Sequence, residues 1–288
     1  MKRVLLAGAS GYLGRAMLAE LKTRGYWVRV LVRTEQQQQA LSQIADDTFL
    51  GQATDIDTLS GLMDGIDLVF TSIGITRQKD GLTYESVDYG ANLNLLTLAE
   101  NSKVEKFIYV SVFNADKLPG IKIIQAKEKF VARLKSSWLP YCVIRPSGFF
   151  ADMKEFLVMA KSGRVYLLGN GQLRFNPISG ADLAKVCCDM FQSEQTEVDV
   201  GGPEVYSHDQ IAELAFKALG EPVKMTHFPL WLVGALVSVM RWLSPVSVYG
   251  PVEFFAKAMS VDMQAPCYGE ESLESFFVHL ANIDNRAS

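Results

Sequence analysis

The first fourteen residues constrain the fold most, because an apolar run passes directly into closely spaced glycines. Residues 4–7 read Val-Leu-Leu-Ala, and a glycine recurs at every third position from Gly8 to Gly14. Residues 13–21 then carry Leu or Met at every fourth position, the spacing of one helix face. Such a turn lets backbone N–H groups approach a pyrophosphate, and the positive end of the following helix attracts the same charge. The stretch predicts a strand, a turn and a helix that bind a dinucleotide; a glycine turn in another α/β protein is the alternative.

Composition excludes several classes of protein. The 288 residues are 49% hydrophobic, which is ample for a buried core, and the net charge of −4 gives no electrostatic footprint for nucleic acid. The four cysteines lack Cys-x-x-Cys spacing and the three histidines are scattered. We therefore expect reduced thiols in a cytoplasmic protein, no metal site and no nucleic-acid partner.

Buried strands and amphipathic patterns alternate through the first half of the chain. Strands are expected over residues 27–32, 49–50, 67–72, 107–111 and 141–145, and helices through Leu59 and Met63, over 84–102 and around Lys127. This alternation predicts an α/β fold with a doubly wound, parallel Rossmann-type sheet. Ligands of such sheets bind past the carboxyl ends of the strands, so we expect the loops that follow the strands to share one crevice.

The residue at the end of the second strand decides the cofactor. An acidic side chain there would bind the ribose 2′-hydroxyl of NAD, whereas Arg33 neutralises a 2′-phosphate and favours NADP (NADPH). A solvated strand terminus is the alternative reading of Arg33. The residues expected to bind the cofactor are Gly8, Ser10, Gly11, Tyr12, Leu13, Gly14, Arg33, Gln52, Ser72, Gly74, Lys127, Pro146 and Phe149.

Lys127 is the ionisable residue that we single out for chemistry. Beside a nicotinamide ribose, its ammonium group would hold the ribose hydroxyls and supply or polarise a proton during reduction. The same predicted helix carries four other basic residues, so a solvated lysine is the competing interpretation.

Several stretches of the chain share motifs with a known superfamily. In the first half they are residues 8–14, 31–33, Ser111, 125–130 and 144–150. With these motifs the chain resembles the short-chain dehydrogenases/reductases, in their atypical, NmrA-like branch. Residues 169–171, 176–182, 201–204 and 268–277 are similar to divinyl chlorophyllide vinyl reductases and their uncharacterised relatives. The resemblance covers nearly the whole chain.

The resemblance implies catalytic roles for Lys127 and Ser111 and a nicotinamide pocket lined by Pro146 and Phe149. It also exposes two departures. The tyrosine that the superfamily places four residues before the lysine is Ile123 here, and Gln52 stands where relatives often carry an aspartate against adenine. Ene reductases of the isoflavone-reductase type also lack the tyrosine and keep the lysine, so the resemblance still implies a reductase.

The second half is expected to form a smaller, mostly helical substrate lobe. We expect residues 1–148 to form the dinucleotide-binding domain, with 173–202 returning to it, and residues 149–172 and 203–288 to form the lobe. Residues 165–168 and 173–175 predict a short β pair around a turn. Ser207 with Gln210 predicts a capping box that opens a helix ending at Gly220.

Residues 228–243 form a markedly apolar run that contains two tryptophans. The run is shorter than the ~20 residues that a membrane span requires, so we expect no transmembrane helix. Packing in the core or in a lid is the default expectation. An apolar substrate pocket, a protein partner surface and a peripheral membrane contact are the alternatives.

Taken together, these features predict an NADP-dependent reductase that transfers hydride to a C=C or C=O bond of an apolar small-molecule substrate. The alternative is a non-catalytic NADPH-binding sensor or assembly factor with the same fold, which Ile123 favours and Lys127 opposes. A sugar-nucleotide epimerase is disfavoured by Ile123 and by the apolar lobe.

Overall fold

The computed structural model describes residues 1–76, 78 and 81–287, which group into two compact units. The first unit contains Met1–Val112, Pro119–Arg145 and Leu183–Val198, and the second contains Phe113–Leu118, Pro146–Asp182 and Asp199–Ser288. The segment of the second half that joins the first unit is therefore shorter than the expected range 173–202. A substrate role for the second unit stays a prediction.

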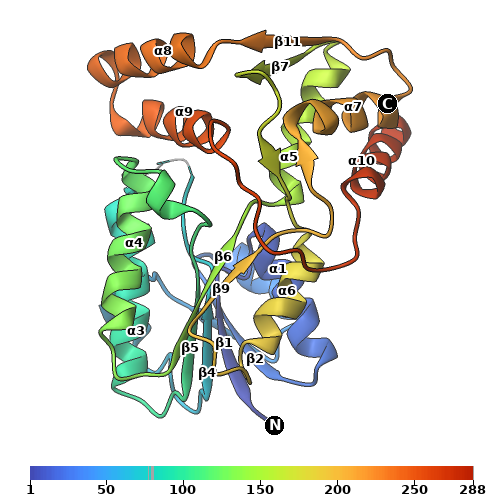
Figure 1. Cartoon of the computed structure of the whole chain (residues 1–288). Helices are drawn as coiled ribbons and strands as arrows, with labels where there is room; N and C mark the ends of the chain where they lie inside the picture. The colour runs from blue at the N-terminus through green and yellow to red at the C-terminus, as the bar shows by residue number, and fades with distance from the viewer. Residues whose placement is uncertain (77, 79–80, 288) are drawn as a thin grey trace. The chain divides into compact units, whose positions relative to one another are not determined.

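The first unit is built on a parallel sheet. Within the described residues this sheet has seven strands in the order β3-β2-β1-β4-β5-β6-β9 (Figure 1). Their bounds are β1 Arg3–Ala7, β2 Trp27–Val32, β3 Asp47–Leu50, β4 Leu68–Thr71, β5 Lys106–Val110, β6 Tyr141–Pro146 and β9 Glu197–Val200. Neighbours from β3 to β6 pair in parallel. Because the strand order reverses beside β1, the carboxyl ends of β1 and β4 flank the point where such sheets bind ligands. The predicted Rossmann-type fold is confirmed.

Helices cover both faces of this sheet. The helices are α1 Tyr12–Thr23, α2 Glu35–Leu41, α3 Asn92–Glu100, α4 Lys122–Lys135 and α6 Gly180–Asp189. Figure 1 shows α3 and α4 on one face, and α1 and α6 on the other. The sulfur atoms of Met17 on α1 and Cys188 on α6 lie 3.9 Å apart.

Two of the expected helices differ from the structure. The helix expected through Leu59 and Met63 is only a 3-10 turn, η1 (Ile56–Leu59), because Gly61 follows with φ +80°, a left-handed conformation that ends a helix. The stretch expected to be helical over 84–102 begins as a π-helix, η2 (Glu85–Ala91), and continues as α3. π-helical turns are rare and occur frequently at functional sites.

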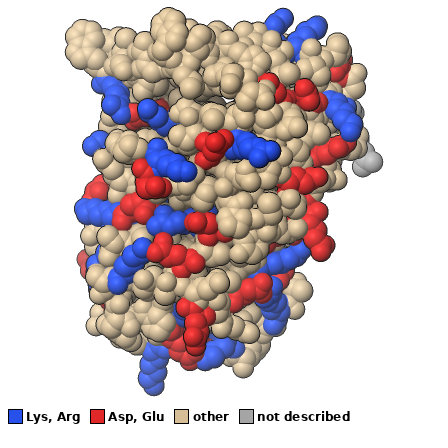
Figure 2. All heavy atoms as spheres, in the orientation of Figure 1, with Lys and Arg blue, Asp and Glu red and all other residues tan. Residues whose placement is uncertain are grey.

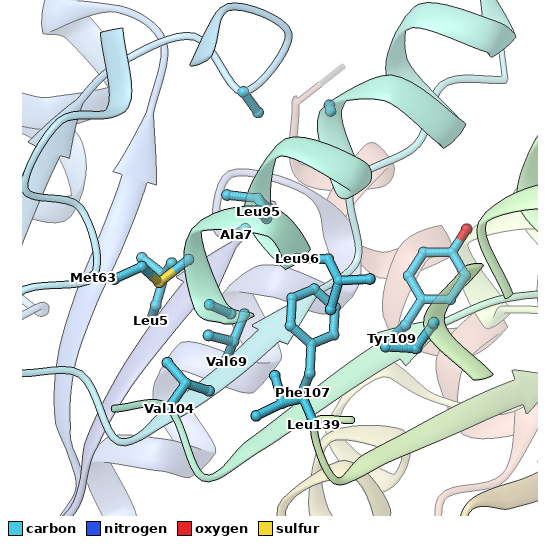
Figure 3. Close-up of a cluster of buried hydrophobic side chains, with 14 of the residues drawn as sticks. Leu5, Ala7, Met63, Val69, Leu95, Leu96, Val104, Phe107, Tyr109 and Leu139 are labelled. Atoms are coloured by element: carbon cyan, nitrogen blue, oxygen red, sulfur yellow. The ribbon is translucent and has the colours of Figure 1, made fainter. Parts of the chain in front are cut away.

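The core of the first unit lies between the sheet and the helices. All residues of β4 and β5 are buried, as expected for central strands of a parallel sheet that is covered on both faces. Figure 3 shows Leu5, Val69 and Phe107 of the sheet beside Leu95 and Leu96 of α3. The ring of Tyr109 meets the ring of Phe130 edge-on at 4.6 Å between centroids. This packing fixes β5, which Ser111 follows directly, and α4, which carries Lys127.

The second unit consists of short strands and helices. Its elements are α5 Phe150–Lys161, β7 Val165–Leu168, β8 Arg174–Phe175, β10 Tyr206–Ser207, α7 His208–Leu219, β11 Met225–Phe228, α8 Leu230–Leu243, α9 Val246–Ala258 and α10 Leu273–Ala287. The predicted capping box is confirmed, because Ser207 and Gln210 bond each other's backbone N–H groups at the start of α7. The helix ends at Gly220 with φ +70°, as expected.

The β pair expected between residues 165–168 and 173–175 is wrong. Instead, β7 pairs in parallel with β11, and β8 pairs antiparallel with β10. The intervening turn does not close a hairpin because it is held by α7: the N–H group of Asp209 donates to the carbonyl oxygen of Gly171. The strands on either side of this turn, β7 and β8, therefore pair with strands later in the chain.

The default expectation for residues 228–243, packing in the core or in a lid, is wrong as regards the core. Of the α8 residues only Val237 is buried, and Trp231 and Trp242 are 73% and 85% exposed. None of the helices within the described residues has the length and apolarity needed to cross a bilayer. The apolar run is therefore neither core nor span.

Candidate cofactor site

The glycine loop (residues 8–14) is fixed by steric contacts with its own backbone. Gly8 adopts φ +94°, and its carbonyl oxygen accepts a 3.0 Å hydrogen bond from the N–H group of Gly11. A Cβ atom on Gly14 would lie 2.0 Å from the carbonyl oxygen of Gly8, and one on Gly8 would lie 2.8 Å from Oγ of Ser72. Only glycine fits at Gly8 and Gly14, so the loop packs closely against the start of α1 and the end of β4.

The N-terminus of α1 is suited to an anion. Its N-cap residue is Gly11, which offers no side-chain cap, and its first turn has no acidic residue. Ser10, Gly11 and Tyr12 are exposed at this end, whereas Leu13 is buried. The exposed N–H groups and the helix dipole together favour a diphosphate. Leu13 would therefore contribute its backbone and not its side chain.

Arg33 lies beside this loop, through contacts of Gln37 on α2. The side-chain amide nitrogen of Gln37 lies 3.4 Å from Oγ of Ser10, and its amide oxygen accepts from the N–H group of Arg33 at 3.0 Å. The guanidinium group of Arg33 is exposed and forms no ion pair with the described residues. Its binding of a phosphate stays a prediction, and the sequence prediction missed Gln37, which holds the backbone of Arg33. The spacing of three residues between Gln37 and the N-cap Thr34 was the only signal.

Gln52 and Ser72 follow the next strands along the same edge of the sheet. The N–H group of Gly51 donates to the carbonyl oxygen of Val32, and that of Ser72 donates to Ala7. Gln52 is exposed, and its backbone is held by Oγ1 of Thr58 at 2.9 Å. The structure thus brings the glycine loop, Arg33, Gln52 and Ser72 to the carboxyl ends of neighbouring strands.

The loop after β4, residues 72–75, is held by two polar residues that the sequence prediction missed. Asn92 is fully buried, accepts from Oγ1 of Thr71 at 2.8 Å and donates to the carbonyl oxygen of Ile73 at 3.2 Å. Asp88 accepts from the N–H group of Ile75 at 3.3 Å. The available signal was their spacing of four, which puts Asp88 and Asn92 on the helix face shared with Leu95 and Leu96.

Lys127 is largely buried against this loop and is not the solvated lysine of the competing interpretation. Its side chain is 12% exposed, and Nζ lies 3.1 Å from Oδ1 of Asp88, whose side chain is fully buried. A Cβ atom on Gly74 would lie 2.8 Å from Nζ of Lys127 and 2.6 Å from Oδ1 of Asp88. Because Gly74 has no side chain, the ion pair of Lys127 and Asp88 can pack directly against the backbone of the loop that follows β4.

The electrostatics of the cluster keep Lys127 cationic. Burial acts to lower its pKa, but Tyr109 and the carboxylate of Asp88 outweigh burial and raise the pKa above its ordinary value. Burial raises the pKa of Asp88, although the ammonium group of Lys127 opposes this, and burial raises the pKa of Tyr109 to about 12. A permanent ammonium group of this kind holds hydroxyl groups and stabilises negative charge, but it does not readily release its proton.

Ser111 belongs to a separate polar cluster at the end of β5. It is buried, and its hydroxyl group donates to Oε1 of Glu128 at 2.7 Å. Arg145 binds both oxygens of Glu128, at 2.7 and 2.9 Å, which fixes the carboxylate. The hydroxyl hydrogen of Ser111 is therefore directed to Glu128, and its catalytic role stays a prediction.

The remaining predicted positions offer no acid. Ile123 is buried on α4, so an apolar side chain occupies the position of the superfamily's tyrosine. Pro146 and Phe149 belong to the second unit, where Pro146 ends β6 and Phe149 is the N-cap residue of α5. Their place beside a nicotinamide stays a prediction.

Comparisons with known proteins indicate the same class of cofactor. Residues 8–194 match a family described as NAD(P)H-binding. The chain is 26% identical to the chloroplastic divinyl chlorophyllide a 8-vinyl-reductase of Arabidopsis thaliana, over 95% of this chain and 75% of the relative. It is 25% identical to the Photosystem II assembly factor Ycf39 of Trieres chinensis, over 85% of this chain and 78% of the relative.

A solved structure shares the fold. The NADPH complex of an NADPH-dependent quinone oxidoreductase from Escherichia coli superposes with a TM-score of 0.77 and 15% identity, covering 96% of this chain and 99% of that chain. At this level of identity the likeness concerns the fold alone.

Proposed function

Because the chain belongs to the NAD(P)H-binding family, we propose that it is an NADPH-dependent reductase that transfers hydride to a C=C or C=O bond of an apolar substrate. The observation that carries the proposal is the buried ammonium group of Lys127, held by Asp88 at the end of β4. Maintaining a buried charge costs free energy, and a charge kept at the ligand-binding edge of a Rossmann-type sheet is typical of a functional site.

The residues divide the work of binding and chemistry. The glycine loop and the N-terminus of α1 bind the diphosphate, and Arg33 binds the 2′-phosphate that distinguishes NADPH from NADH. Lys127 holds the ribose hydroxyls next to the nicotinamide and stabilises negative charge that develops on the substrate. NADPH, when bound, supplies the hydride, and the protein orients the reactants and excludes water.

The substrate class rests on similarity and on what the site lacks. Ile123 provides no phenolic acid, which an alcohol dehydrogenation of the usual kind would use. The site therefore fits better a reduction in which water, or another group near the substrate, supplies the final proton. Several relatives are named as vinyl reductases of divinyl chlorophyllide, a named substrate with C=C bonds. A cytoplasmic location stays a prediction, since these relatives are named as chloroplastic.

A second candidate is a non-catalytic NADPH-binding assembly factor. The relatives named as a Photosystem II assembly factor match with identities similar to those of the reductases, and Ile123 removes the usual acid. Both candidates use the same cofactor site, so cofactor binding does not separate them.

Anaerobic oxidation of NADPH tests the two candidates. The reductase proposal predicts sustained turnover with at least one member of a panel of enones, quinones and tetrapyrroles with vinyl groups, and a strong loss of turnover in Lys127→Ala. Tight NADPH binding without oxidation across the panel would favour the assembly factor.

Arg33→Ala tests the choice of cofactor. Loss of a charge-assisted contact to the 2′-phosphate should weaken NADPH binding by roughly tenfold or more and leave NADH binding nearly unchanged. Calorimetric titration with both cofactors measures this difference. Equal losses for both would remove the role proposed for Arg33.

A further inference from the structure

We propose that α8 and α9 form a docking surface for an anionic lipid bilayer, with α8 lying in the plane of the membrane interface. The surface consists of the outward face of α8 and of three exposed residues on one face of α9, namely Val248, Val252 and Phe255. The outward face of α8 consists of Trp231, Leu232, Ala235, Leu236, Val239, Trp242 and Leu243.

The outward face of α8 is a continuous apolar stripe. At 100° per residue, its seven side chains project within an arc of about 140°, and no charged residue falls inside this arc. Trp231 and Trp242 are eleven residues apart, which is close to three full turns, so both indoles lie on the same side near opposite ends of the helix. Each large side chain of the stripe is more than two-fifths exposed.

The opposite side of α8 is also apolar, with Val233, Val237 and Met240. Apart from Ser238 and the paired Arg241, α8 is therefore apolar on both sides, and a helix of that composition is normally buried in a protein or in a membrane. With 14 residues, α8 is about 21 Å long, which is too short to cross the ~30 Å hydrocarbon core of a bilayer. It can therefore bury its outward face in lipid only by lying along the interface.

Helix α9 extends the apolar surface. Val248, Val252 and Phe255 recur at the spacing of one helix face and are 51%, 40% and 43% exposed. The guanidinium group of Arg241 on α8 pairs with Glu253 on α9, which is 2% exposed, and this ion pair joins the two helices. Figure 2 shows few charged side chains in its upper left part, over the position of α8 in Figure 1.

The charges of this segment select an anionic surface. The ionic residues of α8 and α9 are Arg241, Lys257 and Glu253, and the acidic residues Glu221 and Asp262 lie outside these two helices. Glu253 is buried and pairs with Arg241, so the exposed ionic groups of the two helices, Arg241 and Lys257, are both positive, although the whole chain carries a net charge of −4. Anionic lipid headgroups attract such a segment, each basic residue contributing about 1 kcal/mol near the surface.

A lipid occupant fits the outward face better than a protein occupant does. Protein interfaces carry roughly one hydrogen bond per 100–200 Å², whereas the only polar groups on this face are the two indole N–H groups. Tryptophans are enriched at the membrane–water interface, where the ring is buried and the N–H group reaches the headgroups. Two such residues at the ends of one apolar face match a helix that lies flat at that depth.

Vesicle flotation of the full chain tests the proposal. The wild type should float with vesicles of phosphatidylcholine mixed with phosphatidylglycerol, and more weakly with phosphatidylcholine alone. The double variant Trp231→Ser/Trp242→Ser should partition less by roughly tenfold or more, since each indole loses its apolar contact with lipid. Trp138→Ser is the matched control, because Trp138 is 67% exposed on the first unit and should leave partition unchanged.

The proposal is overturned if the wild type stays in the lipid-free fraction. It is also overturned if the wild type and the double variant float equally well. A lipid-free dimer that the double variant abolishes, without any flotation, would assign the face to a second copy of the chain. Equal flotation with both vesicle types would overturn the anionic selection. NADPH affinity, measured on the same samples, should be unchanged in all three proteins, so this test does not depend on the proposed reductase activity.

Discussion

Lys127 in the first unit and His208 in the second are both buried titratable residues, yet the two units treat them in opposite ways. Burial acts to lower the pKa of each. At Lys127 the neighbouring Tyr109 and Asp88 reverse this effect and raise the pKa. At His208 burial prevails over Asp209 and Asp262 and lowers the pKa to about 4, and the aromatic ring of Phe175 lies edge-on to the imidazole.

The difference shows which buried polar residue is a candidate for chemistry. A fold that buries a histidine without close pairing to a buried carboxylate keeps it neutral, and such a residue contributes packing. A fold that keeps a lysine charged must also supply a buried carboxylate, and here Asp88 also holds the loop that carries Gly74. The paired charge, and not burial alone, therefore points to the site.

Removing Lys127 is the strongest way to break this comparison. Lys127→Met leaves the carboxyl group of Asp88 buried without its counter-charge, and the unfolding free energy should fall by about 3–5 kcal/mol near pH 7. Loss of the ammonium group raises the pKa of Asp88 further, so the folded state retains a proton that the unfolded state releases. The destabilisation should therefore grow as the pH rises through the carboxyl range and be smaller near pH 4. Urea unfolding at both pH values measures it.

The double variant Lys127→Met/Asp88→Asn is the control for this prediction. It removes both charges, so it should recover a substantial part of the stability that Lys127→Met alone loses. If the unfolding free energy lost by the double variant equals the sum of the losses in Lys127→Met and Asp88→Asn, the two residues do not interact. The pair would then not be the reason for the burial of Lys127.

The pH dependence of His208 tests the other side of the comparison. Its folded-state pKa of about 4 lies below the ordinary 6.5, so in acid the unfolded state binds a proton that the folded state excludes. Stability from this residue is present above the unfolded pKa and is lost as the pH falls toward 4, by about 2 kcal/mol between pH 7 and pH 5. The difference in unfolding free energy between the wild type and His208→Gln should follow this course. Parallel profiles of the two proteins would contradict it.

Local patterns predicted much of the first unit. An apolar run gave the bounds of β2, and the glycine spacing located the loop that Gly8 and Gly14 close sterically. In the second half, Ser207 and Gly220 marked the ends of α7 correctly. In each case the determinant is a contact between residues close in sequence, or a burial pattern with the period of one element.

Features that depend on distant partners were missed. Asp88 is 39 positions before Lys127, and nothing near either residue shows that α4 and η2 bring them together. The expected hairpin failed for the same reason, since β7 pairs with β11, which lies 57 or more positions later. For α8, hydrophobicity predicted burial in the core or in a lid, yet all of its residues but Val237 are at least partly exposed, because composition alone does not show which elements pack against a helix.

Calorimetric titration of NADPH into the wild type and Gly11→Asp tests the central claim most directly. An aspartate at the N-cap of α1 is a favoured capping residue, so the stability of the variant should stay within about 1 kcal/mol of the wild type. Its carboxylate would occupy the place proposed for the diphosphate and repel it. The account predicts one-site binding of NADPH by the wild type and binding weaker by roughly tenfold or more in Gly11→Asp. A wild type that binds no NADPH, or a folded Gly11→Asp that binds it equally well, would contradict the account.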